Sequence, residues 1–371
     1  MIRARTITCR CFAHRGRIRP IVAVERARGM TDTSKTLPSM QRRRLLTAFA
    51  ASPLVAACQG SFAGPERGPI AALFLGRIKD GDFDEQGSLG LQRMSRELGI
   101  PVRMLDGVGS DRTAVLDALR ELATSPATMI VVHGGAASEA VQRAAWEFPR
   151  KRFTQIQGDR LRPNLAIYRV RDEQSAWLAG GAAAMLSKSG VLGHVSTKDR
   201  DDAIALHTAF TAGARTTNAR IHVLDAAMPA ALDTDAIGRA AIAQIGTGAD
   251  HLFVTGSTTT VVEAVRGHSV RLIGQGRDWV ATHPSFFVAS AVADTGAAIM
   301  RLGQDMQDSI WRGDLIRYYG LRYPEMVRLV TAANAPANVL ATIDDLAGQL
   351  AAGRIQIPRT ERDRKLDAAS R

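Results

Sequence analysis

The chain reads Ile70-Ala-Ala-Leu-Phe-Leu75, a short apolar run that stops at Gly76 and is followed by the polar segment Arg77-Ile-Lys-Asp-Gly-Asp-Phe-Asp-Glu-Gln86. Residues 88–98 then repeat Leu and Met at the spacing of an amphipathic helix. The apolar run is typical of a strand that is buried on both faces of a parallel sheet. The order of strand, loop and helix predicts the first half of a βαβ unit, in which ligands bind at the carboxyl end of the strand.

Phe83 stands in this loop between acidic residues, where an aromatic ring gains little from exposure to water. A flat ring flanked by carboxylates suits a ligand with a planar face and hydrogen-bond donors, so Asp80, Phe83 and Asp84 are candidate binding residues. The alternative is that Phe83 folds back to cap the core while the acids stay in water. The local sequence by itself favours that alternative.

Length, charge and cysteine usage limit the function. The 371 residues suit two lobes of about 100–150 residues each. Residues 1–57 hold 12 of the 48 Lys and Arg but only two of the 36 Asp and Glu, so +10 of the net charge of +12 belongs to them and +2 to the rest. The body of the chain therefore gives no electrostatic support for nucleic-acid binding. Of three cysteines only Cys58 could survive export, which excludes an internal disulfide and a cysteine-based zinc site in the body.

The segment 40–57 has a basic start, a short apolar run and small residues before a cysteine, as in a secretory signal peptide. Its end, Val55-Ala-Ala-Cys58, resembles the lipobox of bacterial lipoproteins, in which the cysteine is lipidated and anchors the exported protein to a membrane. Residues 58–68 are then a lipidated linker, and residues 1–39 a gene-model extension or a disordered segment. Ordinary cleavage with a soluble product is the alternative. The export route, Sec or twin-arginine, stays open.

From residue 69 onward, short apolar runs alternate with amphipathic segments, which predicts an α/β fold with parallel sheets and right-handed connections. Strands are expected at 70–75, 101–105, 128–132, 153–156, 165–169, 191–195, 220–224, 251–254, 270–273 and 326–331. Helices are expected at 87–99, 111–123, 136–147, 173–188, 202–217, 233–246, 258–266, 294–312 and 341–352. No low-complexity linker divides the two series, so two lobes should touch along a cleft. The charged end of the chain, 358–371, is expected to be disordered.

Two further turns follow predicted strands. In His133-Gly134-Gly135, glycine would let the backbone approach a ligand, and a tight turn into the next helix explains it equally well. Gly256 and Ser257 take the matching place in the second series. There the hydroxyl groups either meet a polar ligand or cap the helix that follows.

Catalytic and metal-binding patterns are missing from the sequence. His194, His207, His251 and His283 lack the spacing of a metal site. Ser257 has no nucleophile-elbow context and no patterned His or Asp partner. We therefore predict a protein that is not an enzyme and that needs no metal or other cofactor.

Four motifs, in this order, resemble the basic membrane protein family of substrate-binding lipoproteins, also called purine-nucleoside-receptor-like. The segment Asp80-Gly-Asp-Phe-Asp-Glu-Gln86 is similar to the family's Asp-Lys-Ser-Phe-Asn-Gln loop. The others are Asn164-Leu-Ala-Ile-Tyr-Arg-Val-Arg-Asp-Glu-Gln-Ser-Ala-Trp-Leu-Ala-Gly180, Phe210-Thr-Ala-Gly213 and Ala351-Ala-Gly-Arg-Ile-Gln-Ile-Pro358. The resemblance extends from about Ile70 to Pro358.

This resemblance implies a type I periplasmic-binding-protein fold, with two Rossmann-like lobes, a three-stranded hinge and a ligand between the lobes. Lobe 1 would comprise residues 69–172 plus 285–312, and lobe 2 residues 173–284 plus 313–357. Such proteins pass small molecules to the permease of an ABC importer, and we expect this one to act as a monomer. In the family a Phe stacks on a purine, and here that residue is Phe83. Trp177 lies in the second motif and is a further candidate.

The sequence also departs from the family pattern. Where the family has Ile-Gly-Val-Asp-Ser-Asp-Gln, this chain has Ile273-Gly-Gln-Gly-Arg-Asp-Trp279, so the ribose-binding aspartate has become Gly276. The expected lysine is Ala293. Asp278 and Trp279 stand in the same loop and are candidate ligand contacts. A nucleobase or another planar solute therefore fits as well as a nucleoside.

Three other classes of protein compete with this interpretation. A receptor-only sensor of the same fold would look the same in sequence. An exported α/β enzyme would need a nucleophile and base, and a sugar-repressor-like regulator would need a DNA-binding headpiece where residues 1–57 form a leader.

Overall fold

The computed structural model describes residues 68–78, 83–198, 200–227 and 234–369, which all belong to one compact unit of the chain, Ser61–Arg371. The leader, Cys58 and Asp80 lie outside the described residues, so what the sequence predicts for them stays a prediction. Within the described ranges, no helix has the length and apolar character needed to cross a membrane.

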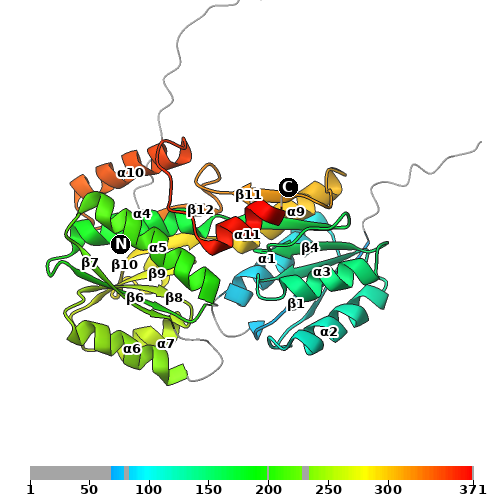
Figure 1. Ribbon diagram of the computed structural model, residues 1–371, viewed down its shortest axis with the longest axis horizontal. Coiled ribbons are helices and arrows are strands. Elements are labelled where there is room, and N and C mark those ends of the chain that lie inside the picture. The colour runs from blue at the N-terminus through cyan, green and yellow to red at the C-terminus, as the bar shows by residue number, and fades with distance from the viewer. Residues whose placement is uncertain (1–67, 79–82, 199, 228–233, 370–371) are drawn as a thin grey trace, which may run out of the picture. The chain divides into compact units, whose positions relative to one another are not determined.

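The described strands form two six-stranded sheets (Figure 1). The first sheet has the order β11-β5-β4-β3-β1-β2 and is parallel throughout. The second has the order β12-β10-β9-β8-β6-β7 and is parallel except for β12, which runs antiparallel to β10. The strands of the first sheet are β1 (Ile70–Phe74), β2 (Val102–Leu105), β3 (Met129–His133), β4 (Arg152–Ile156), β5 (Leu165–Val170) and β11 (Ile316–Tyr319). Those of the second are β6 (Val191–Ser196), β7 (His222–Ala227), β8 (His251–Thr255), β9 (Arg271–Gly276), β10 (Phe287–Ala293) and β12 (Val327–Thr331).

Helices pack on both faces of each sheet (Figure 1). The first sheet is covered by α1 (Phe83–Leu98) and α9 (Thr295–Gln307) on one face and by α2 (Arg112–Thr124) and α3 (Ser138–Glu147) on the other. The second is covered by α4 (Asp172–Leu186), α5 (Arg200–Thr217) and α10 (Ala337–Ala351) on one face, and by α6 (Thr234–Gly246) and α7 (Thr258–Ala264) on the other. The remaining helices are α8 (Trp279–Thr282) and α11 (Glu361–Ala369).

Strand β1 shows why its sequence is continuously apolar. All five of its residues are buried. Ile70 and Phe74 contribute to the core beneath α1 and α9, whereas Ala71 and Leu73 contribute to the core beneath α2 and α3. Successive side chains of a strand point to opposite faces, and here both faces are covered.

Helices α4 and α5 cross at very short range because glycines stand at the crossing. A Cβ atom on Gly180 would lie 1.9 Å from the carbonyl oxygen of Phe210, and one on Gly213 would lie 1.8 Å from that of Trp177. Glycine thus permits the close approach of two helix backbones. Trp177 is only 2% exposed and belongs to the core of the second sheet. Two of the family-like motifs therefore serve this helix packing.

The chain crosses between the two sheets three times within the described residues, after β5, after β10 and after β11. The division of the strands between the two sheets differs from the expected boundaries of the two lobes. Residues 285–312 were assigned to the first lobe, but β10 pairs in the second sheet and only α9 packs with α1. Strand β11, expected in the second lobe, pairs with β5 in the first sheet. Its sequence, Ile-Arg-Tyr-Tyr, contains residues that favour strands, but four residues are too few to predict a strand.

The C-terminal segment is ordered, contrary to the disordered tail expected from its charges. Residues 361–369 form α11, in which Leu366 is buried against the core of the first sheet. Arg362 is 5% exposed and reaches the carboxylates of Asp172, Glu173 and Asp202. The charges of this segment are thus matched by partners distant in sequence, which composition alone does not reveal.

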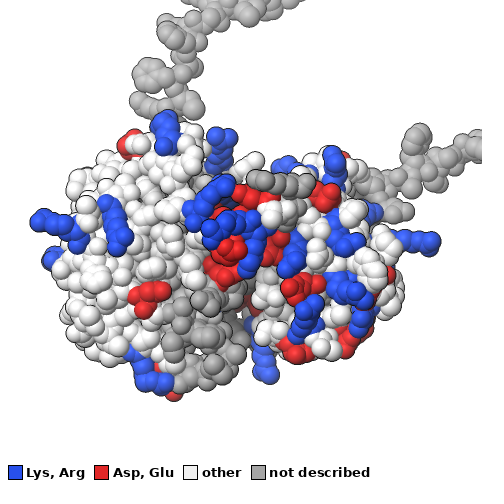
Figure 2. All heavy atoms as spheres, in the orientation of Figure 1, with Lys and Arg blue, Asp and Glu red and all other residues white. Residues whose placement is uncertain are grey.

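Charged side chains are unevenly spread over the face shown in Figure 2. Lys, Arg, Asp and Glu are intermixed over α2, α3 and α11, whereas the part formed by the second sheet and its helices shows few charges. On this face, basic residues alternate with acidic ones. A binding surface for nucleic acid would instead gather basic residues without acidic neighbours.

Candidate functional site

A cavity of about 270 Å³ lies where the carboxyl ends of strands from both sheets meet. Its lining residues from the first-sheet side are Leu75, Gly76, Arg77, Phe83, Asp84, His133, Gly134, Gly135, Ala136, Gln157 and Asp172. Those from the second-sheet side are Thr197, Lys198, Asp202, Gly256 and Ser257. A narrow continuation of about 30 Å³ adds Gln86, Gln275, Gly276, Arg277, Trp279, Ala293 and Thr295. In open α/β sheets this is the edge at which ligands bind.

A larger hollow of about 490 Å³ lies beside the C-terminal segment. Its lining includes Arg171, Tyr318, Leu350 and residues 355–359, but no residue that follows a strand of the second sheet. The smaller cavity is the better candidate because turns from both sheets converge on it.

Phe83 is the first residue of α1, which begins four residues earlier than the sequence predicts. Its ring centroid lies 4.1 Å from that of His133, at the end of β3. The ammonium nitrogen of Lys198, which follows β6 in the second sheet, lies 4.5 Å from the centroid of the Phe83 ring. The aromatic ring thus lines the cavity from one sheet and is met by a cation from the other.

Beneath Phe83, a chain of hydrogen bonds fixes His133. One carboxylate oxygen of Asp84 is 3.0 Å from Nδ1 of His133, and the other accepts a hydrogen bond of 2.9 Å from the backbone N–H of Gly76. Nε2 of His133 is 2.9 Å from the hydroxyl oxygen of Thr295. Asp84 lines the cavity as predicted, yet both of its oxygens already have protein partners, so its carboxylate orients the histidine beneath the ring.

The turns predicted from glycine do line the cavity. Gly134 and Gly256 have φ angles of 105° and 93°, and Ser257 has a φ of 47°. These left-handed conformations turn the backbone at the ends of β3 and β8. Ser257 makes no capping hydrogen bond to α7, and its hydroxyl instead donates to Oγ1 of Thr197 at 3.3 Å. Gly135 lines the cavity next to Gly134.

Buried charges lie at the edge of the cavity. Burial raises the pKa of Asp172. Burial also opposes the ionisation of Asp202, but nearby Arg362, Arg169 and Lys198 lower the pKa of its carboxyl group. Nη1 of Arg362 is 2.9 Å from Oδ1 of Asp202, and Nη2 is 3.4 Å from Oδ1 of Asp172. The cavity therefore offers hydrogen-bond acceptors that protein cations hold in place.

Contacts between the two sheets close the narrow continuation. The side chain of Gln86 accepts hydrogen bonds from Thr295 and donates one of 3.1 Å to the carbonyl oxygen of Gly276. An ion pair of 3.0 Å joins Arg277 to Glu85. Helix α1 is thereby linked to the end of β9.

A comparison with known protein families matches residues 69–360 to the family described as "ABC transporter substrate-binding protein PnrA-like". The chain belongs to this family. The predicted resemblance is thus confirmed, and the family is one of substrate-binding proteins rather than of enzymes.

Relatives of the PnrA-like chain are distant in sequence. The purine-binding protein of Brucella abortus is 20% identical over 213 residues, which is 57% of this chain and 60% of that relative. The chain thus matches less than two thirds of that relative's length. Basic membrane protein A of Borreliella burgdorferi is 22% identical over 291 residues, or 75% of this chain and 84% of the relative.

Solved structures confirm the fold class of this PnrA-like protein. A solute-binding protein of an ABC transporter system from Aeropyrum pernix has a TM-score of 0.70 at 18% identity, covering 81% of this chain and 98% of the other. One from Conexibacter woesei has a TM-score of 0.63 at 22% identity, covering 78% and 98%. The predicted type I periplasmic-binding-protein fold is therefore correct.

Other predicted site residues of the PnrA-like chain lie elsewhere or do another task. Trp177 is in the core of the second sheet and does not line either part of the cavity. Asp278 caps α8 by accepting a hydrogen bond of 3.1 Å from the N–H of Ala281, and it does not line the cavity either. Trp279 lines the narrow continuation, but its ring is buried and packs on Phe287.

Sequence reasoning missed several polar residues that line the cavity: Gln86, Gln157, Asp172, Lys198 and Thr295. A signal for four of them was present. Each follows the end of a strand by one or two residues: Gln157, Asp172, Lys198 and Thr295. The strand-end rule identifies them once it is applied to every strand rather than to the turns with aromatic or glycine residues.

Proposed function

We propose that the chain is an exported, lipid-anchored solute-binding protein that delivers a small planar solute resembling a nucleobase to an ABC importer. The proposal rests on the ring of Phe83, which lines a cavity formed by strand ends of both sheets. Lys198 lies over that ring, and Trp279 lines the same cavity's continuation. Aromatic walls combined with a few polar groups are typical of sites for flat ligands.

The polar lining suits a solute with both donors and acceptors. The carboxylates of Asp172 and Asp202 accept hydrogen bonds, and the ammonium group of Lys198 donates them. A nucleobase carries ring N–H groups and carbonyl or ring-nitrogen acceptors around a flat apolar face. The name of the Brucella abortus relative, a purine-binding protein, supports the same class of ligand.

A free base is favoured over a ribonucleoside. Gly276 and Ala293, which stand where the family carries the ribose-binding aspartate and lysine, line the narrow continuation and supply no polar side-chain atom. Burying ribose hydroxyls without partners costs about 1–3 kcal/mol each. The carboxylate of Asp278, the acid that a shifted register would bring into this role, is held at the start of α8.

A panel of ligands tests the proposal. The full chain is titrated by calorimetry with hypoxanthine, adenine, inosine and adenosine, and a thermal-shift screen adds other nucleosides and small amides. We expect the bases to bind more tightly and to raise the melting temperature, since ligand at 100 Kd stabilises a protein by about 2.7 kcal/mol. Tighter binding of the nucleosides, lost in Asp278→Ala, would show that the ribose is recognised and that the free-base assignment is wrong.

Lipidation is tested separately because Cys58 lies outside the described residues. Labelled palmitate is expected to enter the wild-type protein expressed in a bacterial host and not the Cys58→Ser variant. The matched control is Cys9→Ser, which should still be labelled. Label in Cys58→Ser, or none in the wild type, would contradict the lipid anchor and leave the solute-binding proposal untouched.

A further inference from the structure

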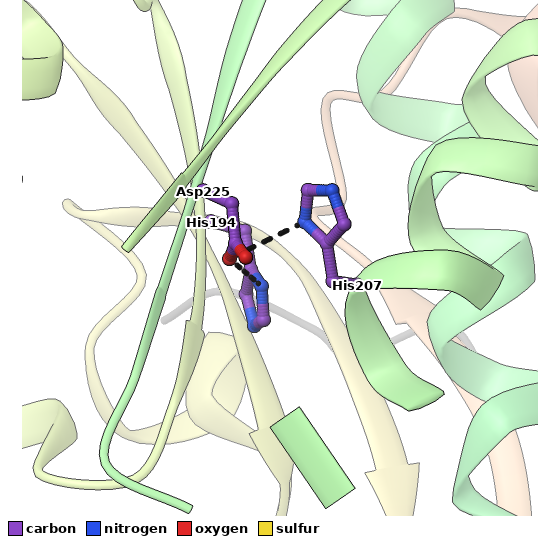
Figure 3. A group of neighbouring side chains, drawn as sticks. All are labelled: His194, His207 and Asp225. Atoms are coloured by element: carbon purple, nitrogen blue, oxygen red, sulfur yellow. Dashed lines mark hydrogen bonds and ion pairs between the residues drawn. The ribbon is translucent and has the colours of Figure 1, made fainter. Parts of the chain in front are cut away.

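Three side chains that the sequence separates converge at one edge of the second sheet (Figure 3). His194 on β6 and Asp225 on β7 are direct partners in the pairing of these strands. His207 reaches the same carboxylate from α5. Nδ1 of His194 lies 3.0 Å from Oδ1 of Asp225, and Nδ1 of His207 lies 3.4 Å from the same oxygen. All three groups offer ligand atoms within 4.8 Å of one another.

The second nitrogen of each imidazole ring faces a threonine. Nε2 of His194 is 3.0 Å from Oγ1 of Thr255, and Nε2 of His207 is 3.4 Å from Oγ1 of Thr211. A hydroxyl oxygen can accept a hydrogen bond from a protonated Nε2, and in that tautomer the lone pair of Nδ1 is available to an ion. His194, whose Nδ1 is paired with Asp225, would adopt this tautomer when an ion binds. Histidines that bind metals are oriented in this way, by a hydrogen bond from the other ring nitrogen.

A nitrogen without a hydrogen-bond partner also favours a bound cation. Nδ1 of His207 is buried and has no hydrogen-bond partner among the described residues. Two imidazoles, one of which makes no hydrogen bond at Nδ1, therefore face a carboxylate.

We propose that His194, His207 and Asp225 bind a divalent transition-metal ion of the zinc class, through two Nδ1 atoms and one carboxylate oxygen. Tetrahedral Zn²⁺ holds nitrogen and oxygen ligands at about 2.0–2.2 Å, which places ligand atoms about 3.3–3.5 Å from one another. The nitrogen–oxygen distances of 3.0 and 3.4 Å are close to that spacing. Imidazole ligands favour zinc, copper or nickel over magnesium and calcium.

The site would be open on one side. The side chain of His194 is fully buried, whereas those of His207 and Asp225 are 24% and 42% exposed. Three protein ligands leave the fourth position of a tetrahedral ion to water. The ion would link α5 to the two strands at the sheet edge. None of the three residues lines the solute cavity, so this proposal does not depend on the identity of the solute.

The experiment uses the full chain without a histidine tag, with Cys9, Cys11 and Cys58 changed to serine so that no thiolate competes for metal. Zinc chloride is titrated by calorimetry, and X-ray absorption of the zinc-loaded protein reports its ligands. We expect saturable binding of one ion per chain with nitrogen and oxygen neighbours. Asp225→Asn and His207→Gln should each weaken binding by at least about tenfold. The matched controls Asp308→Asn and His268→Gln change exposed residues elsewhere and should bind zinc as the parent does.

Melting temperatures measured in EDTA show whether each variant is folded, and the partly exposed ligands are changed first because removal of buried His194 risks the fold. Zinc should raise the melting temperature of the parent and of both controls but not of the two site variants. Equal zinc affinity in the site variants and the parent, or no saturable binding by the parent, would overturn the proposal. In that case the group is a hydrogen-bonded His–Asp–His cluster that binds protons only.

Discussion

His133 in the first sheet and His194 in the second have nearly the same surroundings. Both are buried, and in each the Nδ1 atom lies 3.0 Å from an aspartate oxygen and the Nε2 atom 2.9–3.0 Å from a threonine hydroxyl. Each ring also packs on a phenylalanine, Phe83 in one case and Phe253 in the other. The same arrangement of aspartate, histidine and threonine thus occurs in each sheet.

The two groups differ in what surrounds the aspartate. The carboxylate of Asp84 is 17% exposed and is also held by the backbone of Gly76, so its hydrogen bonds are complete. The carboxylate of Asp225 is 42% exposed and faces a second histidine, His207. One group is a closed support beneath an aromatic ring of the cavity, and the other is open to solvent and to an ion. The role of each group therefore depends on the residues around its aspartate as well as on the shared pattern of aspartate, histidine and threonine.

The largest expected difference concerns stability. Asp84→Ala leaves both Nδ1 of His133 and the N–H of Gly76 without a hydrogen-bond partner. It should therefore lower the free energy of unfolding by about 2–4 kcal/mol. Asp225→Ala removes a partly exposed acid and leaves one buried nitrogen, Nδ1 of His194, without its partner, so it should cost less, about 1–2 kcal/mol, in the presence of EDTA. Urea denaturation measures both. Equal losses would show that the two groups are equivalent supports.

The second test separates the two phenylalanines by ligand affinity. Phe83→Leu keeps apolar volume but removes the flat face, and it should weaken binding of a planar solute by about 1–3 kcal/mol. Phe253→Leu repacks the core of the second sheet and should lower stability by about 1 kcal/mol without changing affinity. Calorimetry and urea denaturation are run on both variants. Normal affinity in Phe83→Leu together with reduced stability would mean that this ring merely caps the core.

A smaller effect is expected from the ion pair that joins the two halves. Arg277 and Glu85 are 37% and 35% exposed, and Arg277→Gln should weaken solute binding by less than about 1 kcal/mol. The matched control is Arg266→Gln, which breaks a pair with Glu263 at the end of α7 and leaves the link between the sheets intact. The two variants are compared by calorimetry at low and high salt. A loss confined to Arg277→Gln that disappears at high salt would support the link.

The smallest effect is expected from pH in metal-free protein. Burial holds the pKa of His207 below its ordinary value of 6.5, so the unfolded chain binds the proton first as the pH falls. Stability should therefore decline as the pH drops below about 6.5, and His207→Gln should lessen that decline. The lowered pKa of Asp225 adds a further loss near and below pH 3.8. Thermal unfolding from pH 8 to 5 isolates the histidine, and an identical decline in His207→Gln would contradict this assignment.

The fold was largely accessible from the sequence because buried parallel strands and amphipathic helices leave local patterns. Strand β1 is apolar throughout since both of its faces are covered. The sequence did not predict strand β11 or helix α11, because both depend on contacts between distant parts of the chain. The pairing of β11 with β5 and the ion pairs of Arg362 come from distant parts of the chain, and neither leaves a local pattern.

The site was only partly accessible. Phe83, Gly134 and Gly256 carry signals of their own, an aromatic ring in a polar loop and glycine after a strand. Asp278 caps a short helix outside the cavity lining, and an acid in that position looks the same in sequence as one that binds a ligand. The pair His194 and Asp225 could not be predicted, because it depends on the register between β6 and β7.

Helix α11 joins the two halves of the protein in a way that constrains their movement. Leu366 packs into the core of the first sheet, while Arg362, one turn earlier, pairs with Asp202 on α5. If the sheets swing apart, either the leucine must leave its apolar surroundings or the guanidinium must leave its carboxylates. Both the apolar contact of Leu366 and the ion pair of Arg362 are shielded from water, so breaking either of them costs free energy. Helix α11 is thus expected to favour the arrangement in which the two halves stay together.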